Sequence, residues 1–372
     1  MRNITLCELE VGQPLPWDVY GEGGGLLARK GYLITNDNQI DNLIKRGMVV
    51  REPERDAADY VEPPSVLRML NGANRCLEAI LTEIAAGRAR QAQARLEEVA
   101  QTVAESVKLC SEVALACILH NQQAGPYSVR HSIDTAIVSI LAARALKKTP
   151  EEVKTITLAA LTMNVGMLQE QERMQAMHEP LSITDVRFIR SHPEASVALL
   201  RAAGISDEAW LECVLSHHEN ENGSGYPNHK QADDIPGLAK IISLADRYCA
   251  RVSARSYRKP MLPNAALRDI LLEGKSTIDA QLAAVFIREL GVYPVGTYVR
   301  LLNGEIGVVT RKGVSSTTPI VDALVGPRGA PLENPIRRDT KEERLAIREV
   351  LCGAQADVMF NLDRLWGRVA AV

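Results

Sequence analysis

The long helical pattern between Pro126 and Leu290 constrains the fold of this chain more than any other feature. Apolar residues recur there at three- and four-residue steps, as on one face of an α-helix. The predicted helices cover residues 131–146, 151–168, 182–203, 206–218, 237–254, 263–273 and 277–290. Because amphipathic helices bury their apolar faces against one another, a helical bundle is expected here.

The composition indicates a globular protein of more than one domain. The chain has 372 residues, 46% of them hydrophobic and 24% charged, and a domain size of roughly 150 residues predicts two or three units. A net charge of −3 provides no general attraction for a nucleic acid polymer or an anionic membrane. The chain starts without a signal-like apolar stretch, and no run reaches the ~20 apolar residues of a membrane span. Seven cysteines without a Cys-x-x-Cys pattern fit reduced thiols, so a cytoplasmic protein is expected.

A small accessory domain of mixed α/β character is expected at residues 1–62, with a regulatory role. Val11–Trp17 and Gly31–Ile34 resemble short strands, and the glycine-rich residues 21–25 between them signal a turn. Asn36 or Asp37 is a candidate cap for a helix that runs to Gly47. A strand at residues 48–50 and a linker with Pro53, Pro63 and Pro64 complete the unit.

Residues 65–121 are predicted to form a helical linker to the main domain, which is placed at residues 122–290. Gly87 separates two apolar runs, and the second, from Ala92 to Cys117, repeats near every 3.5 residues. That spacing fits either a dimerising coiled coil, and hence a homodimer, or a helix packed on the next domain. Many of the repeated positions are Ala, Cys or Val, which favours packing on the next domain.

Residues 291–372 are predicted to form a β appendage with a helical tail. Residues 295–302 and 305–309 flank Asn303-Gly304, which is typical of a hairpin with a type I′ turn. A third strand at Pro319–Val325 and a turn at residues 326–329 follow. Residues 340–343, Thr-Lys-Glu-Glu, resemble a capping box for terminal helical segments. The expected fold class is mainly α: a helical bundle with a small mixed α/β N-terminal domain and a C-terminal β-hairpin appendage.

Four histidines and one carboxylate are the candidate metal ligands of the helical domain. They are His131, His192, His217, His218 and Asp246, each in or beside an apolar helix. Imidazole is the commonest protein ligand for metals, and side chains from separate helices of a bundle can converge on an ion. In the loop after His218, Gly223 and Gly225 allow the backbone to approach a ligand closely. The alternative for each side chain taken singly is a hydrogen-bonded polar residue without a metal.

These elements together resemble the HD-GYP branch of the HD phosphohydrolases, a family that cleaves cyclic di-GMP. The resemblance covers about residues 120–290. The matching motifs are Tyr127–Ser132, Ser191–Pro193, His217–Glu219, Asn222–Pro227, Leu244–Tyr248 and Arg255–Arg258. The family folds as an HD-type helical bundle that holds two or three metals, usually iron or manganese. The resemblance therefore makes the four histidines and Asp246 metal-ligand positions.

The resemblance also implies a ligand-binding surface beside the metals. Gly223, Gly225, Tyr226 and Pro227 form the Gly-Tyr-Pro loop of this surface, and Arg255 and Arg258 lie where the family binds the phosphate. The planar guanidinium of arginine can donate two charge-assisted hydrogen bonds to a phosphodiester. The alternative for these arginines is a solvated basic face.

The chain departs from the family at the motif His-Asp-x-Gly-Lys. Met163, Asn164 and Met167 replace its His, Asp and Lys, and in the family that aspartate bridges two metals. Asn164 is neutral, Met163 is a soft thioether unsuited to an oxygen-rich hydrolytic centre, and Met167 offers a phosphate no charge. No catalytic residue of this motif is intact. One iron or manganese ion at His192, His217 and His218 is therefore expected, or none.

Three functions are compatible with this pattern. The first is a degenerate HD-GYP protein of bacterial cyclic di-GMP signalling, which binds the dinucleotide or a partner such as a diguanylate cyclase without efficient hydrolysis. It follows from the loss of the two-metal site that activates the nucleophile and clamps the reacting oxygens. The second is a slow cyclic di-GMP phosphodiesterase that uses the residual metal. The third is a pure interaction scaffold that works through the Gly-Tyr-Pro loop.

Overall fold

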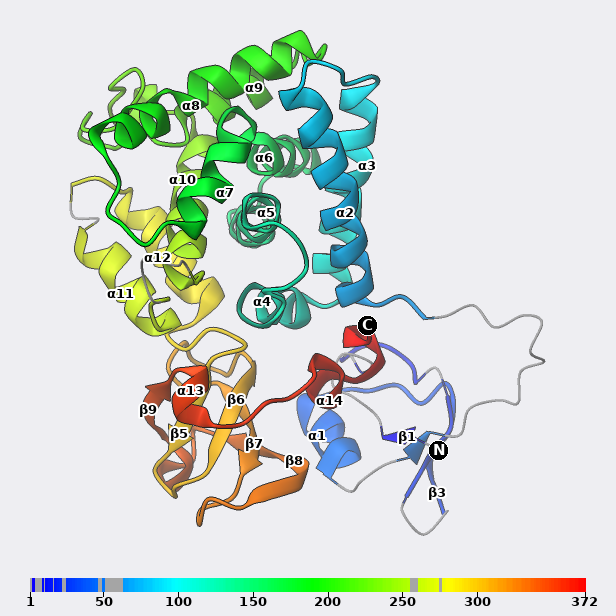
Figure 1. The fold of residues 1–372 in the computed structure, drawn as a ribbon. Coiled ribbons are helices and arrows are strands. Elements are labelled where there is room, and N and C mark those ends of the chain that lie inside the picture. The colour runs from blue at the N-terminus through cyan, green and yellow to red at the C-terminus, as the bar shows by residue number, and fades with distance from the viewer. Residues whose placement is uncertain are drawn as a thin grey trace.

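A single buried helix, α5 (Tyr127–Ala145), forms the centre of the helical domain in the computed structural model (Figure 1). Sixteen of its 19 residues are buried, as expected of a helix that is covered on all sides. The structure describes residues 2–3, 9, 11–15, 17–21, 25–45, 49–50, 63–254, 260–273 and 276–372.

The helices predicted from periodicity are present, with ends that shift by up to four residues and a larger difference at the end of the predicted helix 151–168. They are α6 (Pro150–Thr162), α8 (Ile183–Ala202), α9 (Glu208–Ser216), α10 (Gly237–Val252), α11 (Pro263–Glu273) and α12 (Ala280–Leu290). Capping boxes at Thr149 and Ser182 start α6 and α8. The predicted helix 151–168 is wrong in its last turn, because α6 ends at Thr162 and a 3-10 turn, η2 (Val165–Met167), follows it.

A further helix that the periodicity did not predict, α7 (Leu168–Ala176), follows η2 and packs on α5. The chain breaks before α7 because η2 lies directly against α8. A Cβ atom added to Gly166 would lie only 2.6 Å from the backbone N of Ser196. Only glycine permits this approach, and it brings the sequence 163–167 beside the histidine of α8.

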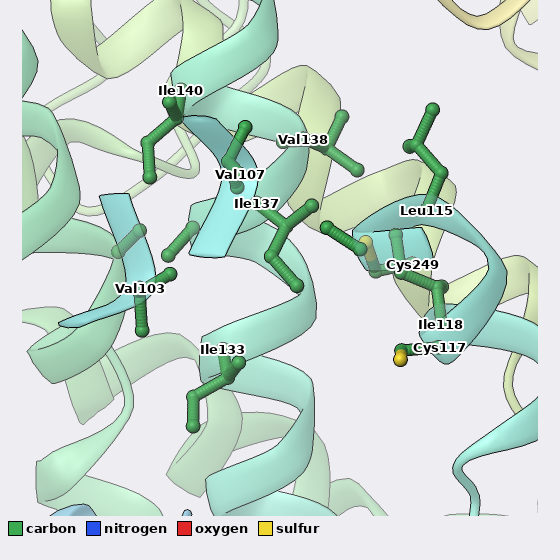
Figure 2. Close-up of a cluster of buried hydrophobic side chains, with 14 of the residues drawn as sticks. Val103, Val107, Leu115, Cys117, Ile118, Ile133, Ile137, Val138, Ile140 and Cys249 are labelled. Atoms are coloured by element: carbon green, nitrogen blue, oxygen red, sulfur yellow. The ribbon is translucent and has the colours of Figure 1, made fainter. Parts of the chain in front are cut away.

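The linker region forms three helices that belong to the core of the helical domain. They are α2 (Val66–Ala85), α3 (Ala92–Leu109) and α4 (Ser111–His120). Gly87 marks the first break, with φ of +66°, and a second break at Cys110 divides the expected continuous helix. All three contact α5, which bears out packing on the next domain. Figure 2 shows Val103 and Val107 of α3 and Leu115 and Ile118 of α4 in the same buried cluster as Ile133 and Ile137 of α5.

The C-terminal region is a five-stranded antiparallel sheet, which is larger than the predicted hairpin. Its strands, in the order β8-β7-β6-β5-β9, are β5 (Tyr298–Leu301), β6 (Ile306–Arg311), β7 (Ile320–Val325), β8 (Pro331–Asp339) and β9 (Ile347–Leu351). The sheet contacts α4 through β6. The tail ends in α13 (Gly353–Ala356), α14 (Leu362–Trp366) and a 3-10 turn, η5 (Gly367–Ala370).

Two local predictions in this region are wrong. Gly304 has a φ of +91°, but Asn303 has no positive φ, whereas a type I′ turn needs both. Instead, the Gly304 N–H donates to the carbonyl of Leu301 in a three-residue loop. The predicted capping box also fails, because the Thr340 hydroxyl donates to the carbonyl of Pro319. Only a 3-10 turn, η4 (Glu343–Leu345), follows before β9.

The described part of the N-terminal unit is of mixed α/β character, as predicted. Its sheet has the order β1-β4-β2-β3, formed by β1 (Arg2–Asn3), β2 (Val19–Tyr20), β3 (Leu26–Ala28) and β4 (Val49–Val50), and its helix is α1 (Asp37–Lys45). Asn36 caps α1 by accepting from the Gln39 N–H. The two predicted strand-like runs meet only in a bridge between Pro14 and Leu33. Residues 22–24, Met48 and Pro53 lie outside the described residues.

Across the described residues, none of the helices is long and apolar enough to cross a membrane.

Candidate functional site

Four helices bring the predicted metal-ligand side chains to one end of α5. His131 lies on α5, His192 on α8 and Asp246 on α10, while His217 and His218 directly follow α9. The side chains form two groups. One contains His192, His217 and His218, and the other contains His131 and Asp246. A cavity lined by His131, His218 and Asp246 connects the two groups.

The three histidines of the first group form a cluster with the spacing of metal ligands. Their candidate ligand atoms all lie within 4.8 Å of one another. Nδ1 of His192 donates to the carbonyl of Ile189 at 2.5 Å, and Nδ1 of His217 donates to the carbonyl of Val214 at 2.6 Å. Because a carbonyl only accepts, these two bonds leave each Nε2 without a hydrogen in the neutral ring.

The lone pairs of His192 and His217 therefore face each other. Their Nε2 atoms are 3.2 Å apart, and two bare nitrogens at this distance repel unless a cation lies beside both. Backbone carbonyls that hold the opposite nitrogen are the usual orienting partners of metal-bound histidine. The donor set thus fits a transition metal ion with an affinity for imidazole.

The protonation state of the cluster also suits metal binding. Burial, together with the adjacent His217 ring, lowers the pKa of His192 to about 3. Burial likewise lowers the pKa of His217 and of His218. All three rings are neutral at pH 7, and neutral imidazole is the form that ligates metals.

The second group is a buried hydrogen-bonded pair. Nε2 of His131 donates to Oδ1 of Asp246 at 2.7 Å. Burial by itself raises the pKa of Asp246, but the hydrogen bond from His131 and the nearby imidazoles outweigh it and hold the pKa below its usual range. Asp246 therefore remains a carboxylate. Among the described residues, only His192, His217 and His218 form a group of three or more candidate ligand atoms close enough together to share a metal ion.

The sequence 163–167 lies beside this site and is anchored by the side chain of Ser196. The Ser196 hydroxyl donates to the Met163 carbonyl at 2.8 Å and accepts the Gly166 N–H at 2.9 Å. Met163 and Asn164 are buried. Oδ1 of Asn164 has no hydrogen-bond partner in the described part of the chain. A neutral amide and a thioether are thus buried in this turn.

The Gly-Tyr-Pro loop is fixed by a carboxylate that sequence reasoning did not single out. Glu219 is only 3% exposed, and its carboxylate accepts the N–H groups of Asn228 at 2.7 Å and Lys230 at 3.1 Å. The Tyr226 N–H donates to the carbonyl of His218, and the two rings stack with centroids 4.7 Å apart. Tyr226 therefore covers the histidine cluster. Its neighbours Gly223 and Pro227 lie in the same loop.

We predict that Gly225→Ala destabilises this loop and weakens metal binding. A Cβ atom on Gly225 would lie 2.5 Å from the backbone of His218, Glu219 and Asn220, so the loop must shift and carry His218 with it. Overpacking of this kind costs about 1–3 kcal/mol, and loss of one ligand should lower metal affinity by at least about 10-fold.

Urea unfolding and metal titration test the Gly225→Ala prediction. The matched control is Gly237→Ala, because a Cβ atom at Gly237 meets nothing within 4 Å. Equal unfolding free energies and equal metal affinities for the two variants would contradict the prediction.

A cavity of about 150 Å³ opens beside Asp246 and Asn164. Its other lining residues include two glutamines of the α7 region, Gln171 and Gln175, together with apolar and aromatic side chains. Sequence reasoning missed both glutamines because α7 has no apolar period, and an isolated glutamine carries no chemical signal. The apolar and aromatic lining residues are Tyr127, Met167, Met174, Leu181, Ile189, Tyr226 and Ala250.

Arg190 is a second feature of the site that the sequence did not reveal. Its guanidinium carbon lies 5.9 Å from the ring centre of Tyr226, within range of a cation–π interaction. Arg190 is exposed and lies two residues before the metal-ligand candidate His192. The predicted phosphate-binding residues Arg255 and Arg258 lie outside the described residues.

Comparison with known proteins identifies the same region of the chain. Residues 115–282 match the family model of the HD domain. The cyclic di-GMP phosphodiesterase PA4108 of Pseudomonas aeruginosa is 28% identical over 264 residues, which are 69% of this chain and 62% of that protein. The cyclic di-GMP phosphodiesterase PdeB of Borreliella burgdorferi is 22% identical over 183 residues, which are 49% of this chain and 48% of that protein.

The chain thus spans less than two thirds of the length of these two relatives. Among solved structures, Bd1817, an HDG"Y"P protein from Bdellovibrio bacteriovorus, is 15% identical. The match covers 76% of this chain and 97% of that one, with a TM-score of 0.49.

Proposed function

This chain belongs to the HD-GYP family of HD-domain proteins, and we propose that it binds cyclic di-GMP without efficient hydrolysis. The observation that carries the proposal is the combination of an intact loop with an altered metal motif. The stacking of Tyr226 on His218 and the clustering of the three histidines support a ligand site at this loop. Asn164 and Met163 occupy the second half of the centre with side chains that cannot replace a bridging carboxylate and an imidazole.

The three clustered histidines would hold one metal ion. Such an ion supplies Lewis acidity when it is bound. Hydrolysis of a phosphodiester by two-metal enzymes also requires a clamp on the leaving oxygen. The chain offers His131 and Asp246 for a second position, but those two side chains are hydrogen-bonded to each other. A binding role follows, with the dinucleotide held at the rim of the site.

The test is a calorimetric titration of the anaerobically purified protein, loaded with iron or manganese, with cyclic di-GMP. We expect saturable binding, about one metal per chain, and no product in the same sample. Rapid formation of linear dinucleotide would refute the proposal.

The second candidate function is slow phosphodiesterase activity, which the oriented and neutral histidine cluster favours. Activity that rises in proportion to bound metal and disappears in His217→Ala would establish it. A protein-interaction scaffold, for example for a diguanylate cyclase, would instead contact the loop and bind no nucleotide.

We predict that Arg190→Ala weakens cyclic di-GMP binding by about 10-fold. Arg190 lies over Tyr226 at the rim of the site, and a charge-assisted hydrogen bond to a phosphate contributes about 1.5–3 kcal/mol. Arg187→Ala is the matched control, because Arg187 is also exposed on α8, whereas the cation–π contact with Tyr226 is made by Arg190. Equal affinity of the two variants in calorimetry would show that Arg190 makes no phosphate contact.

A further inference from the structure

The cavity beside Asp246 has a chemistry that disfavours a phosphate. Its described lining residues include no lysine or arginine. The polar lining residues are Asn164, Gln171, Gln175 and Asp246, together with His131, His218, Tyr127 and Tyr226. Met167 lines the cavity at the position where the family pattern has lysine. Carboxylate and carboxamide oxygens accept hydrogen bonds and repel an anion.

Three carboxamide oxygens around this cavity lack partners. Oδ1 of Asn164 and Oε1 of Gln171 and of Gln175 are buried without a hydrogen bond to any described residue. Asn164 is 3% exposed and Gln171 is 9% exposed. The amide of Gln175 is oriented, because its Nε2 donates to the carbonyl of Ala254 at 2.6 Å. Buried acceptors are almost always paired, so these oxygens are available to a ligand that donates hydrogen bonds.

The remaining walls suit a flat organic group. Met167, Met174, Leu181 and Ile189 provide apolar surface, and Tyr127 provides an aromatic ring. Apolar walls with a few directed polar atoms are the usual composition of a small-molecule site. Cavities of ~150 Å³ bind benzene-sized molecules, so this one has the scale of a single aromatic group and excludes a whole dinucleotide.

We propose that this cavity is a guanine subsite, in which the donors of the base, N1–H and the 2-amino group, meet the carboxamide oxygens of Asn164 and Gln171. The inference rests on the proposed function and assigns one part of the ligand to one part of the site. The phosphates then stay at the rim, near Tyr226 and Arg190. Replacement of the metal-bridging side chain by an amide thus converts half of a metal centre into a base-recognition site.

The proposal predicts that the binding affinity of a cyclic dinucleotide depends on the hydrogen-bonding groups at the edge of its base. Hypoxanthine lacks the 2-amino group, and adenine presents a ring acceptor where guanine presents N1–H. A ring acceptor would face Oδ1 of Asn164 or Oε1 of Gln171, and two acceptors repel. We therefore expect cyclic di-IMP to bind about 10-fold more weakly than cyclic di-GMP, and cyclic di-AMP more weakly still.

The experiment is a calorimetric titration of the full chain with cyclic di-GMP, cyclic di-IMP and cyclic di-AMP, in the parent and in Gln171→Leu. We expect Gln171→Leu to bind cyclic di-GMP about 10-fold more weakly and to lose most of the preference over cyclic di-IMP. Gln169→Leu is the matched control, because Gln169 is exposed on the same helix and should leave both affinities unchanged. Thermal unfolding of each variant establishes that it is folded.

Two results would refute the subsite. One is equal affinity of the parent for cyclic di-GMP and cyclic di-IMP, and the other is a preference that persists in both Gln171→Leu and Asn164→Leu. Either result leaves the proposed function standing. No binding of any dinucleotide to the metal-loaded parent would instead refute the proposed function together with the subsite.

Discussion

Restoring the family side chains in the triple variant Met163→His, Asn164→Asp and Met167→Lys should produce a second metal and an active phosphodiesterase. We expect metal content to rise from about one to about two per chain. Hydrolysis of cyclic di-GMP should increase by roughly 10²- to 10⁴-fold, because the loss of a single partner of a metal site commonly costs 10–100-fold. Metal analysis and chromatographic detection of the linear product check the result.

The physical reason is that the backbone of residues 163–167 is already anchored beside the candidate site. Ser196 holds the Met163 carbonyl and the Gly166 N–H, so the restored side chains start from an anchored turn. Asn164→Asp changes one amide to a carboxylate of nearly the same shape, and its Oδ1 is already unpaired. The new charge lies close to Asp246, and two carboxylates in one buried site repel unless cations lie between them.

The control for the triple variant is the same protein with Asp246→Asn added. Asp246 is the remaining carboxylate of the second position, and its loss should return hydrolysis to the parental level. This control also excludes a contaminating phosphodiesterase. A folded triple variant that binds two metals but hydrolyses no faster than the parent would contradict the proposal that these three side chains limit turnover.

Much of the helical domain was predictable because its helices follow simple rules. The apolar faces repeat regularly, and side chains such as Thr149, Ser182 and Asp207 cap the helices at their starts. The five candidate metal-ligand positions came from short motifs in a fixed order. The motifs do not specify how the histidine rings are oriented. Only the structure shows that carbonyls of the preceding turn leave the Nε2 atoms of His192 and His217 facing each other.

The features that were missed depend on contacts between distant segments. Helix α7 has no apolar stripe and exists because the close packing of Gly166 on α8 redirects the chain. Strand β8 contains Pro331, Pro335 and several charged residues, which a strand tolerates at the edge of a sheet. Glu219 accepts hydrogen bonds from backbone N–H groups that lie close to it only in the folded loop. None of these interactions can be predicted from a local sequence pattern.

A second large effect is expected at Asp134, a buried carboxyl of α5 that lies outside the candidate site. Its side chain is 4% exposed, and Oδ2 has no hydrogen-bond partner among the described residues. Burial raises the pKa of Asp134 to about 8, and the charge of Arg130 offsets only part of this effect. The carboxyl is therefore protonated in the folded protein at neutral pH, although it is ionised in the unfolded chain above about pH 4.

The sign of the pH dependence follows from proton binding. Between about pH 4 and pH 8 the folded protein holds a proton on Asp134 that the unfolded chain has released, so the stability falls as the pH rises through this window. A difference of about four pKa units corresponds to a loss on the order of 5 kcal/mol. Asp134→Asn has the shape of the protonated acid and never ionises, so it removes this loss.

We therefore expect Asp134→Asn to be more stable than the parent, by an amount that is small at pH 5 and reaches several kcal/mol at pH 8. Urea unfolding at several pH values measures the difference, and Asp363→Asn, at an exposed position of α14, is the control. A difference that stays constant with pH would mean that Asp134 is already ionised in the folded protein. In that case another group must compensate the charge, because Asp134 is shielded from solvent. An unpaired buried carboxylate would cost too much free energy to persist in the folded protein.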